Sequence, residues 1–301
     1  MTIRHKKVSL RLHYYKEIIM DTQKLKADCQ YLLPKHLLTR AVGLLAKAKL
    51  GGLTTFMIEQ FIKKYKINTK EIAGRIEDYK TFNDFFSRPL LPDARPINLN
   101  EDTIIYPVDG KISQFGKIEN KFLFQAKNHY YTTEALLADS AEAEAFQNGE
   151  FITIYLSPKD YHRVHIPFNG VLEKMIHVPG DLFSVNPFNA KHIPELFARN
   201  ERVVCYFNTP VGRMAVVFVG ATIVRSISTA WAGTVAPTKN KDITVFEYAD
   251  RELTFPKGAE IGKFFMGSTV ICLFEKDKIK FNEDLQAGQP TRMGMKMAER
   301  L

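Results

Sequence analysis

Cysteine is scarce in this chain of 301 residues, and long hydrophobic segments are absent. Its three cysteines, Cys29, Cys205 and Cys272, lie far apart among apolar neighbours. A disulfide framework is therefore excluded, and we expect small buried thiols in a reducing compartment. No run of about 18 uncharged apolar residues occurs, so we predict no membrane-spanning helix. The basic first residues lack an apolar core and a cleavage site, and a secretory signal is not expected.

Most of the chain has no excess of either positive or negative charge. The net charge of +9 comes from its first quarter. Residues 1–80 hold 17 Lys and Arg against 7 Asp and Glu, whereas residues 81–301 hold 25 against 26. A basic N-terminal region on a nearly neutral body is typical of contact with nucleic acid or with an anionic membrane. No nucleic-acid-binding module accompanies the charge, so nucleic acid is the weaker interpretation.

Two amphipathic helices are predicted within this basic region. The first helix ends at Gly51-Gly52. Its apolar residues fall on one side of a helical wheel, and they are Leu37, Leu38, Ala41, Val42, Leu44, Leu45 and Ala48. The second contains Phe56, Ile58, Phe61, Ile62 and Tyr65, among Lys63, Lys64 and Lys66. Such helices suit a membrane interface, with lysines at the lipid headgroups. The alternative is that the apolar stripe packs on the body and the lysines face solvent.

After a short helix at the cluster Phe82, Phe85 and Phe86 and a proline-rich connector, the chain becomes rich in short strand patterns. The predicted strands are Phe151–Leu156, Val171–Val178, Val203–Phe207, Met214–Val219, Ala221–Ser228, Thr244–Tyr248 and Thr269–Phe274. One helix is expected among them, between Thr132 and Gly149. Strands without regular intervening helices indicate an α+β protein with a predominantly antiparallel β body.

Three local patterns could carry chemistry: Asp109-Gly110 after an apolar run, the segment from Ser157 to His165, and Gly267-Ser268 before a strand. Each pattern also has a plain structural explanation: a turn for the first, histidines in the core for the second and a simple bend for the third. A metal site at His162 and His165 lacks an obvious third ligand, so we expect none. Together the patterns supply Asp109, His165 and Ser268, the groups of an activated serine nucleophile.

A serine hydrolase is the first interpretation of these groups. However, Ser268 is followed by a predicted strand, and not by the helix of a nucleophile elbow. Its hydroxyl could instead attack the carbonyl of Gly267, which has no Cβ to shield it. A base at His165, oriented by Asp109, would then drive an N-to-O acyl shift.

At this point the sequence resembles the phosphatidylserine decarboxylase proenzyme family, from about Tyr31 to Gly294. Long strings carry the resemblance: Thr81–Phe86 with Arg88, Ala94–Ile97, Tyr155–His165, Val178–Asn186, Leu196–Arg202, Val219–Val224, Trp231–Thr234 and Lys257–Gly262. Met266-Gly267-Ser268-Thr269 matches the Leu-Gly-Ser-Thr at which that family cuts itself. Met266 in place of Leu keeps an apolar side chain of similar volume, so we expect cleavage to survive. Arg225 stands where a small residue is expected, and we predict that it lies at the surface.

The resemblance implies self-cleavage after Gly267, into a β chain of residues 1–267 and an α chain of residues 268–301. Asp109, His165 and Ser268 would form the relay, and Ser268 would become a covalent pyruvoyl group. That group would condense with the amine of phosphatidylserine as a Schiff base and accept electrons as CO2 leaves. His162 resembles the family histidine suspected of returning a proton to the α-carbon. The expected product is phosphatidylethanolamine, and no metal is implied.

The expected organisation is a poorly ordered basic leader (1–30), a helical membrane-contacting region (31–90) and a catalytic β-rich body (91–301). Because the lipid substrate stays in its bilayer, a peripheral location on the cytoplasmic side of the cell membrane is expected. The expected partners are anionic lipid and the two chains of one precursor, with a homo-oligomer possible and no nucleic acid. The alternatives are a related serine hydrolase or autoprotease with the same Asp-His-Ser relay, and a catalytically silent membrane-binding protein.

Overall fold

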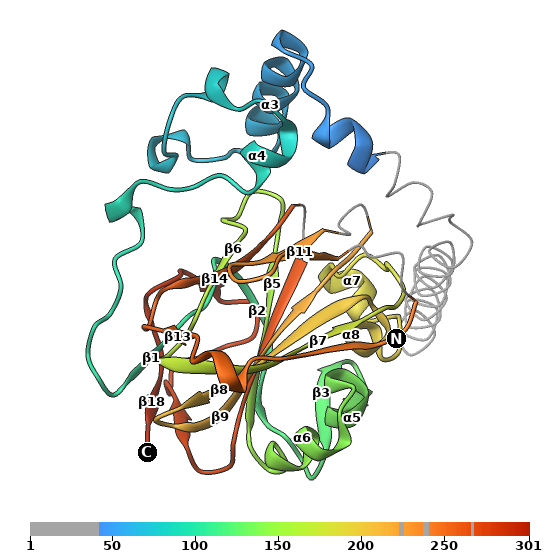
Figure 1. Ribbon diagram of the computed structural model, residues 1–301, viewed down its shortest axis with the longest axis vertical. Coiled ribbons are helices and arrows are strands. Elements are labelled where there is room, and N and C mark those ends of the chain that lie inside the picture. Colours follow the sequence, from blue (N-terminus) through green and yellow to red (C-terminus); the bar gives the residue numbers. More distant parts are fainter. Residues whose placement is uncertain (1–41, 223–225, 237–240, 266–267) are drawn as a thin grey trace, which may run out of the picture.

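The computed structural model describes residues 42–222, 226–236, 241–265 and 268–301 (Figure 1). It shows a small helical segment, residues 42–94, above a larger body built of strands. The predictions for the leader, for the start of the first amphipathic helix, for Cys29, for Arg225 and for Met266-Gly267 lie outside the described residues.

The helical segment contains the second amphipathic helix and the short helix that the sequence predicts. Residues 42–47 are helical, and they precede α3 (Gly52–Tyr65), η1 (Thr69–Glu71), η2 (Ile76–Asp78), α4 (Phe82–Phe86) and η3 (Pro92–Ala94). A capping box begins α4, since Thr81 Oγ1 accepts from the Asp84 amide and Asp84 accepts from the Thr81 amide. Apolar side chains from α3 and α4 form a cluster of their own, which includes Ile58, Phe82, Phe85 and Phe86.

The body is organised by one nine-stranded sheet, whose main path runs β12-β7-β8-β9-β15-β5-β2-β17, with β13 also on β7. The neighbours on this path pair antiparallel, which confirms the α+β class with a mainly antiparallel body. The strands are β2 (Gly110–Lys117), β5 (Glu150–Leu156), β7 (Gly170–Val178), β8 (Arg202–Thr209), β9 (Gly212–Val219), β12 (Thr244–Glu247), β13 (Thr254–Phe255), β15 (Ser268–Phe274) and β17 (Pro290–Thr291).

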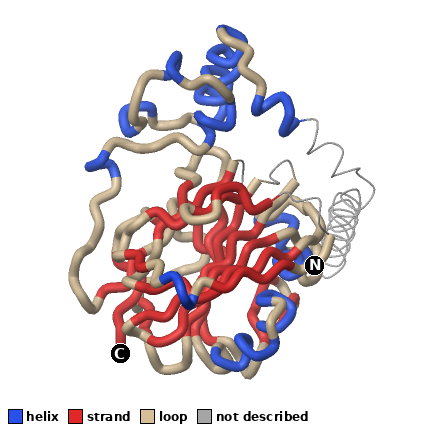
Figure 2. The backbone as a smooth tube through the Cα atoms, in the orientation of Figure 1, coloured by secondary structure: helices blue, strands red, loops and turns tan. Residues whose placement is uncertain are grey.

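Smaller sheets and short helices cover the two faces of this sheet (Figure 2). The smaller sheets are β1-β18-β16 (Thr103–Ile105, Lys296–Arg300, Ile279–Phe281), β11-β10-β14-β6 (Gly233–Ala236, Ile227–Thr229, Glu260–Phe264, Arg163–His165) and β3-β4 (Phe122–Ala126, His129–Thr132). The helices are α5 (Thr133–Leu137), α6 (Ser140–Ala145), α7 (Pro187–Ala190), α8 (Leu196–Arg199) and η4 (Ala249–Arg251).

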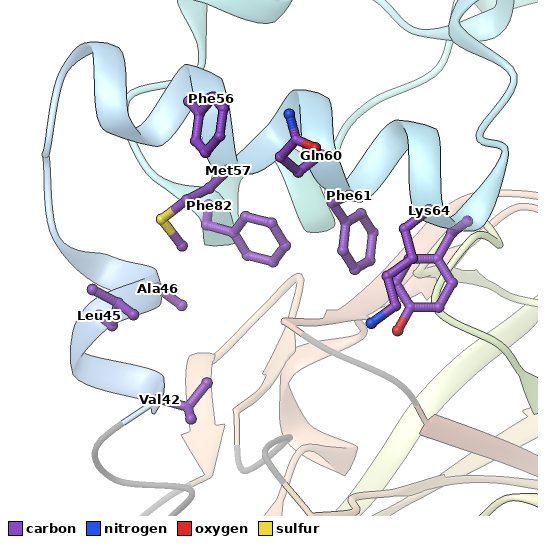
Figure 3. A pocket seen from close by; sticks show the side chains of 10 residues that line it. Val42, Leu45, Ala46, Phe56, Met57, Gln60, Phe61, Lys64 and Phe82 are labelled. Carbon is purple, nitrogen blue, oxygen red and sulfur yellow. The ribbon is translucent and has the colours of Figure 1, made fainter.

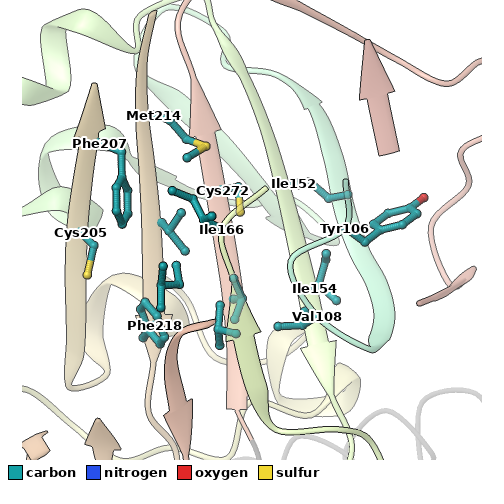
Figure 4. Packing of buried hydrophobic residues seen from close by; sticks show 14 of the residues in the cluster. Tyr106, Val108, Ile152, Ile154, Ile166, Cys205, Phe207, Met214, Phe218 and Cys272 are labelled. Carbon is teal, nitrogen blue, oxygen red and sulfur yellow. The ribbon is translucent and has the colours of Figure 1, made fainter. Parts of the chain in front are cut away.

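The strands β5, β7, β8, β9 and β15 of the central sheet contribute side chains to two apolar cores. Along β15, Val270 and Cys272 belong to the core that faces the smaller sheets, whereas Ile271 and Leu273 belong to the core under α5 to α8. This period of two follows from the alternation of side chains along a strand. Cys205 and Cys272 are both completely buried, and burial raises the pKa of each thiol (Figure 4). The prediction of buried cysteines is thus confirmed for these two.

Two local predictions are wrong. A single helix between Thr132 and Gly149 does not form, because Ala138 takes a left-handed conformation (φ 55°) and Asp139 caps a second helix by accepting from the Glu142 amide. The predicted strand Ala221–Ser228 is also not continuous. Thr222 lies in a turn, and the strand β10 begins at Ile227. At Ala138 a local turn and the cap of Asp139 override the hydrophobic pattern.

None of the described helices combines the length and the apolar character that crossing a bilayer requires.

Candidate active site

Ser268 is the first residue of β15, and it pairs with Leu156 at the end of β5. It shares a face of the strand with Val270 and Cys272, so its side chain points toward the core beside the smaller sheets. The residue is completely buried, and none of the described residues forms a hydrogen bond with its hydroxyl. The position confirms that Ser268 opens a strand. A buried hydroxyl without a partner costs free energy, which suggests a role other than stability.

His165 ends β6, and its ring contacts two neighbours. Its Nδ1 lies 2.7 Å from the carbonyl oxygen of Gly258, and its Nε2 lies 3.1 Å from the hydroxyl of Tyr161. Because a carbonyl can only accept, Nδ1 carries the proton, and Nε2 is the basic nitrogen that accepts from Tyr161. Burial lowers the pKa of His165, although the bond to Gly258 opposes this. The imidazole is therefore a neutral base near neutral pH.

Asp109 follows the turn after Tyr106 and is nearly buried. Its carboxylate accepts from Nε and Nη2 of Arg95, at 2.9 and 2.5 Å, and from the backbone amide of Met293 at 2.9 Å. No hydrogen bond joins it to His165 among the described residues. The backbone brings them near each other, since the His165 amide donates to the carbonyl of Pro107 at 2.9 Å. The negative charge of Asp109 also raises the pKa of His165 slightly.

Arg95 connects this carboxylate to the helical segment. Its Nη1 donates to the Glu71 carboxylate at 3.0 Å, so the guanidinium bridges η1 and Asp109. Burial lowers the pKa of Arg95, but its hydrogen bonds with Asp109 and Glu71 outweigh this and leave it raised. The site therefore depends on a residue of the connector that the sequence patterns did not single out.

His162 lies in the loop between β5 and β6 and is completely buried. Its Nδ1 lies 2.8 Å from the carbonyl oxygen of Asp160, and its ring packs against Phe86, with centroids 4.2 Å apart. Nε2 has no hydrogen-bond partner within the described ranges. Burial lowers the pKa of His162 from 6.5 to about 3, so the ring is neutral.

The loop that carries His162 is held at both ends. Asp160 accepts from the amide and the hydroxyl of Ser157, at 2.7 and 2.6 Å. Arg88, just after α4, donates from Nη2 to the carbonyls of Lys159 and Asp160, at 2.9 and 3.4 Å. Figure 1 shows this loop reaching from the body toward α4. Arg88, Arg95 and Tyr161 all lie in or beside the strings quoted above, which is the only sequence signal that could have found them.

Known proteins resemble this chain over most of its length. Residues 82–299 match the family model described as phosphatidylserine decarboxylase, and residues 25–66 match a second model described as PSD. A phosphatidylserine decarboxylase proenzyme of Shewanella baltica is 53% identical over 281 residues, 91% of this chain and 96% of its own. The proteins of the same name from Shewanella woodyi and Alteromonas mediterranea are 52% and 50% identical over 282 residues each, 92% of this chain and 98% and 86% of theirs.

Proposed function

Because the chain belongs to the phosphatidylserine decarboxylase family, we propose that it converts phosphatidylserine to phosphatidylethanolamine and CO2. The relatives at about half identity carry the name proenzyme, and they are matched over nearly their whole length. Ser268 supports the proposal most directly, since it is a buried serine without a partner at the position of the family's Gly-Ser cleavage site. No observation favours the hydrolase or the silent membrane-binding protein.

Maturation would begin at this hydroxyl. The Nε2 of His165 takes the proton of Ser268, and the oxygen attacks the carbonyl carbon of Gly267. The peptide C–N bond breaks and leaves an ester on the serine oxygen. Loss of the α-proton then expels the Gly267 carboxylate from Cβ. Water hydrolyses the resulting dehydroalanine, which releases ammonia and leaves a pyruvoyl group at the new N-terminus of residues 268–301.

The neighbours of His165 account for its proposed role as the base. Gly258 fixes the tautomer in which Nε2 can accept a proton, and burial keeps this nitrogen unprotonated. Tyr161 occupies Nε2, so the base becomes available when this hydrogen bond opens. Asp109, held by Arg95 and Met293, supplies a fixed negative charge that favours the imidazolium form.

The pyruvoyl carbonyl, once formed, would supply the electron sink that decarboxylation of an amino acid requires. We assign His162 to the return of a proton to the α-carbon. Its Nε2 has no partner in the part of the chain that the structure describes, and the bond from Nδ1 to Asp160 holds the ring in place. The low pKa of this ring means that any proton it gives must arrive during turnover.

The helical segment would hold the enzyme on the membrane surface. Leu44, Leu45, Leu53 and Phe56 are at least half exposed, and lysines accompany them at positions 47, 49, 63, 64 and 66. Figure 3 shows apolar side chains of this segment around a cavity of about 410 Å³, with Lys64 near one end. An apolar surface with lysines beside it suits the interface of an anionic bilayer. The location would be peripheral, on the cytoplasmic side.

The mass of the purified chain tests the proposed function. We expect two fragments, residues 1–267 and 268–301, with a blocked N-terminus on the second, and release of CO2 from phosphatidylserine. An intact chain would refute self-cleavage. A free amino group on Ser268 would refute the pyruvoyl group and favour ester hydrolysis.

A further inference from the structure

Two arginines are almost completely buried, and they differ in how their nitrogens are used. Arg88 and Arg202 are each 3% exposed, and burial lowers the pKa of each to about 10. Every side-chain nitrogen of Arg202 donates to a backbone carbonyl, from residues 135, 136, 198 and 200. In Arg88 only Nη2 does so. Nε and Nη1 are buried without a partner in the part of the chain that the structure describes.

Arg88 also lacks a carboxylate partner. None of the ion pairs between described residues includes it, although it carries a charge in the interior. The Asp160 carboxylate is nearby, but it is bonded to Ser157. A buried cation with unpaired donors is costly unless an anion completes it. The unpaired donors are the first observation, and the Phe85 ring, whose centroid lies 5.2 Å from the guanidinium carbon, offsets only part of their cost.

The second observation is where the guanidinium lies. Nη2 of Arg88 and Nδ1 of His162 both contact the carbonyl oxygen of Asp160, at 3.4 and 2.8 Å. The two side chains therefore converge on one carbonyl oxygen, which places the guanidinium of Arg88 beside the imidazole of His162. The positive charge of Arg88 contributes to the lowered pKa of His162, which agrees with this proximity.

The proposed function identifies which anion could meet Arg88 there. If His162 protonates the α-carbon, the substrate groups next to that carbon lie near Arg88. A serine phospholipid offers two anions, the carboxylate and the phosphodiester. A guanidinium bound to the carboxylate would stabilise the charge that must leave, so it would favour the ground state. The phosphodiester is separated from the α-carbon only by Cβ and one ester oxygen, and it keeps its charge throughout the reaction.

We propose that Arg88 binds the phosphodiester of the phospholipid headgroup through Nε and Nη1, beside the imidazole of His162. This inference rests on the proposed function and adds a residue that recognises the substrate. Guanidinium donors in a planar fork match two phosphate oxygens, whereas an ammonium offers only a point charge.

Steady-state kinetics of the cleaved enzyme test this role. We expect Arg88→Met to raise KM for phosphatidylserine in mixed micelles by about tenfold or more, with kcat changed by less than about threefold, because uniform binding is lost. Arg88→Lys should recover part of the loss. The matched control is Arg202→Lys, which should leave KM unchanged and lower only the melting temperature.

Soluble headgroups show which anion is bound. Glycerophosphoethanolamine has the phosphodiester but neither acyl chains nor a carboxylate. We expect it to bind the cleaved enzyme in calorimetry and to bind Arg88→Met about tenfold more weakly. Inorganic phosphate is the second probe, and equal weakening of both would assign the site to free phosphate and reject the headgroup assignment. A loss of kcat with unchanged binding of glycerophosphoethanolamine would assign Arg88 to the carboxylate instead.

Other outcomes are also decisive. If neither Arg88 variant is cleaved, Arg88 serves maturation or the loop at Lys159 and Asp160, and the proposal is rejected. A lower melting temperature of Arg88→Met with an unchanged KM would also reject the proposal, because Arg88 would then serve only stability. Failure of the proposed function is a separate result, because it would appear in the unaltered protein as an absence of CO2 release.

Discussion

The core beneath α5 to α8 and the loop around His162 differ in how several of their buried polar groups are used, although Tyr131 Oη and Thr133 Oγ1 in that core also lack partners among the described residues. In the first region, Gln125 donates to the carbonyls of Ala190 and Ile193 and accepts from the Leu196 amide, and Arg202 donates only to backbone carbonyls. In the second region, Ser268 Oγ, His162 Nε2 and two nitrogens of Arg88 are buried without partners among the described residues.

The difference separates stability from chemistry. A buried polar group that is fully bonded contributes to the fold, whereas an unpaired one costs about 1–3 kcal/mol. Such a cost is expected where a group must meet a reactant, although it is not proof of one, since the buried hydroxyl of Thr153 also lacks a partner among the described residues. Substitutions in the two regions should therefore have different effects, and the following predictions test this from the largest expected effect to the smallest.

Ser268→Ala should abolish cleavage and decarboxylation together, because the proposed nucleophile and the source of the pyruvoyl group are both lost. Stability should be unchanged or higher by about 1 kcal/mol, since an unpaired hydroxyl is removed. Gel electrophoresis, intact mass and calorimetry provide the readouts. Thr153→Val, at another buried hydroxyl in the sheet, is the control that should still be cleaved. Cleavage of Ser268→Ala would contradict the assignment.

His165→Ala should slow self-cleavage by about 10²–10⁴-fold, as expected for loss of a general base. Because burial lowers the pKa of His165, the cleavage rate of the unaltered chain should be flat around neutral pH and fall only in acid. A time course after translation in vitro measures the rate. His177→Gln, at another buried histidine, should be cleaved normally. A rate that falls already at neutral pH would show that a different base acts.

Arg202→Met should lower the free energy of unfolding by about 2–4 kcal/mol, because several backbone carbonyls lose their donor inside the protein. Urea unfolding measures this. The more exposed ion pair of Arg213 with Glu142 is the comparison, and Arg213→Met should cost about 1 kcal/mol or less. The cleaved fraction of both variants should stay at the level of the unaltered chain. Loss of cleavage in Arg202→Met would erase the distinction between the two regions.

The double variant Leu53→Ser with Phe56→Ser should weaken binding to anionic liposomes by at least about tenfold, because apolar area at the membrane interface is lost. Replacing Lys63 and Lys64 by Gln should remove about 1 kcal/mol per lysine, and this effect should vanish at high salt. Sedimentation with vesicles measures both. Leu99→Ser, at a leucine of the connector that is 77% exposed, is the control. Equal binding of the double variant and the control would show that Leu53 and Phe56 face solvent and do not contact the membrane.

The last expected effect is on acid stability at His162, and it appears only in acid, with none at neutral pH. Its pKa is about 3 in the fold and 6.5 for an ordinary histidine. Below about pH 6.5 the unfolded chain therefore binds a proton that the folded chain refuses, so stability falls as the pH drops toward 3. His162→Phe should flatten this part of the stability curve, as followed by urea unfolding. A curve with the same slope would mean that the ring is protonated in the fold.

Much of the fold followed from local patterns. The runs rich in β-branched and aromatic residues at Phe151–Leu156 and Val171–Val178 predicted β5 and β7 nearly to the residue. The helix expected between Thr132 and Gly149 failed at Ala138, since the left-handed turn and the Asp139 cap are short-range choices that hydrophobic spacing does not reveal. Of the site, Ser268 at the head of a strand was predictable, whereas the partners of His165 and Asp109 were not.

The sequence by itself determined the class of the fold and the family, and it predicted the cleavage site, because these depend on residue types and their spacing. Only the tertiary structure decided that Asp109 is held by Arg95 and Met293, that Tyr161 and Gly258 hold His165, and that Arg88 keeps unpaired donors beside His162. The physical reason is distance along the chain. Asp109 and Met293 are 184 residues apart, and hydrogen bonds over such separations form only after the strands between them have packed.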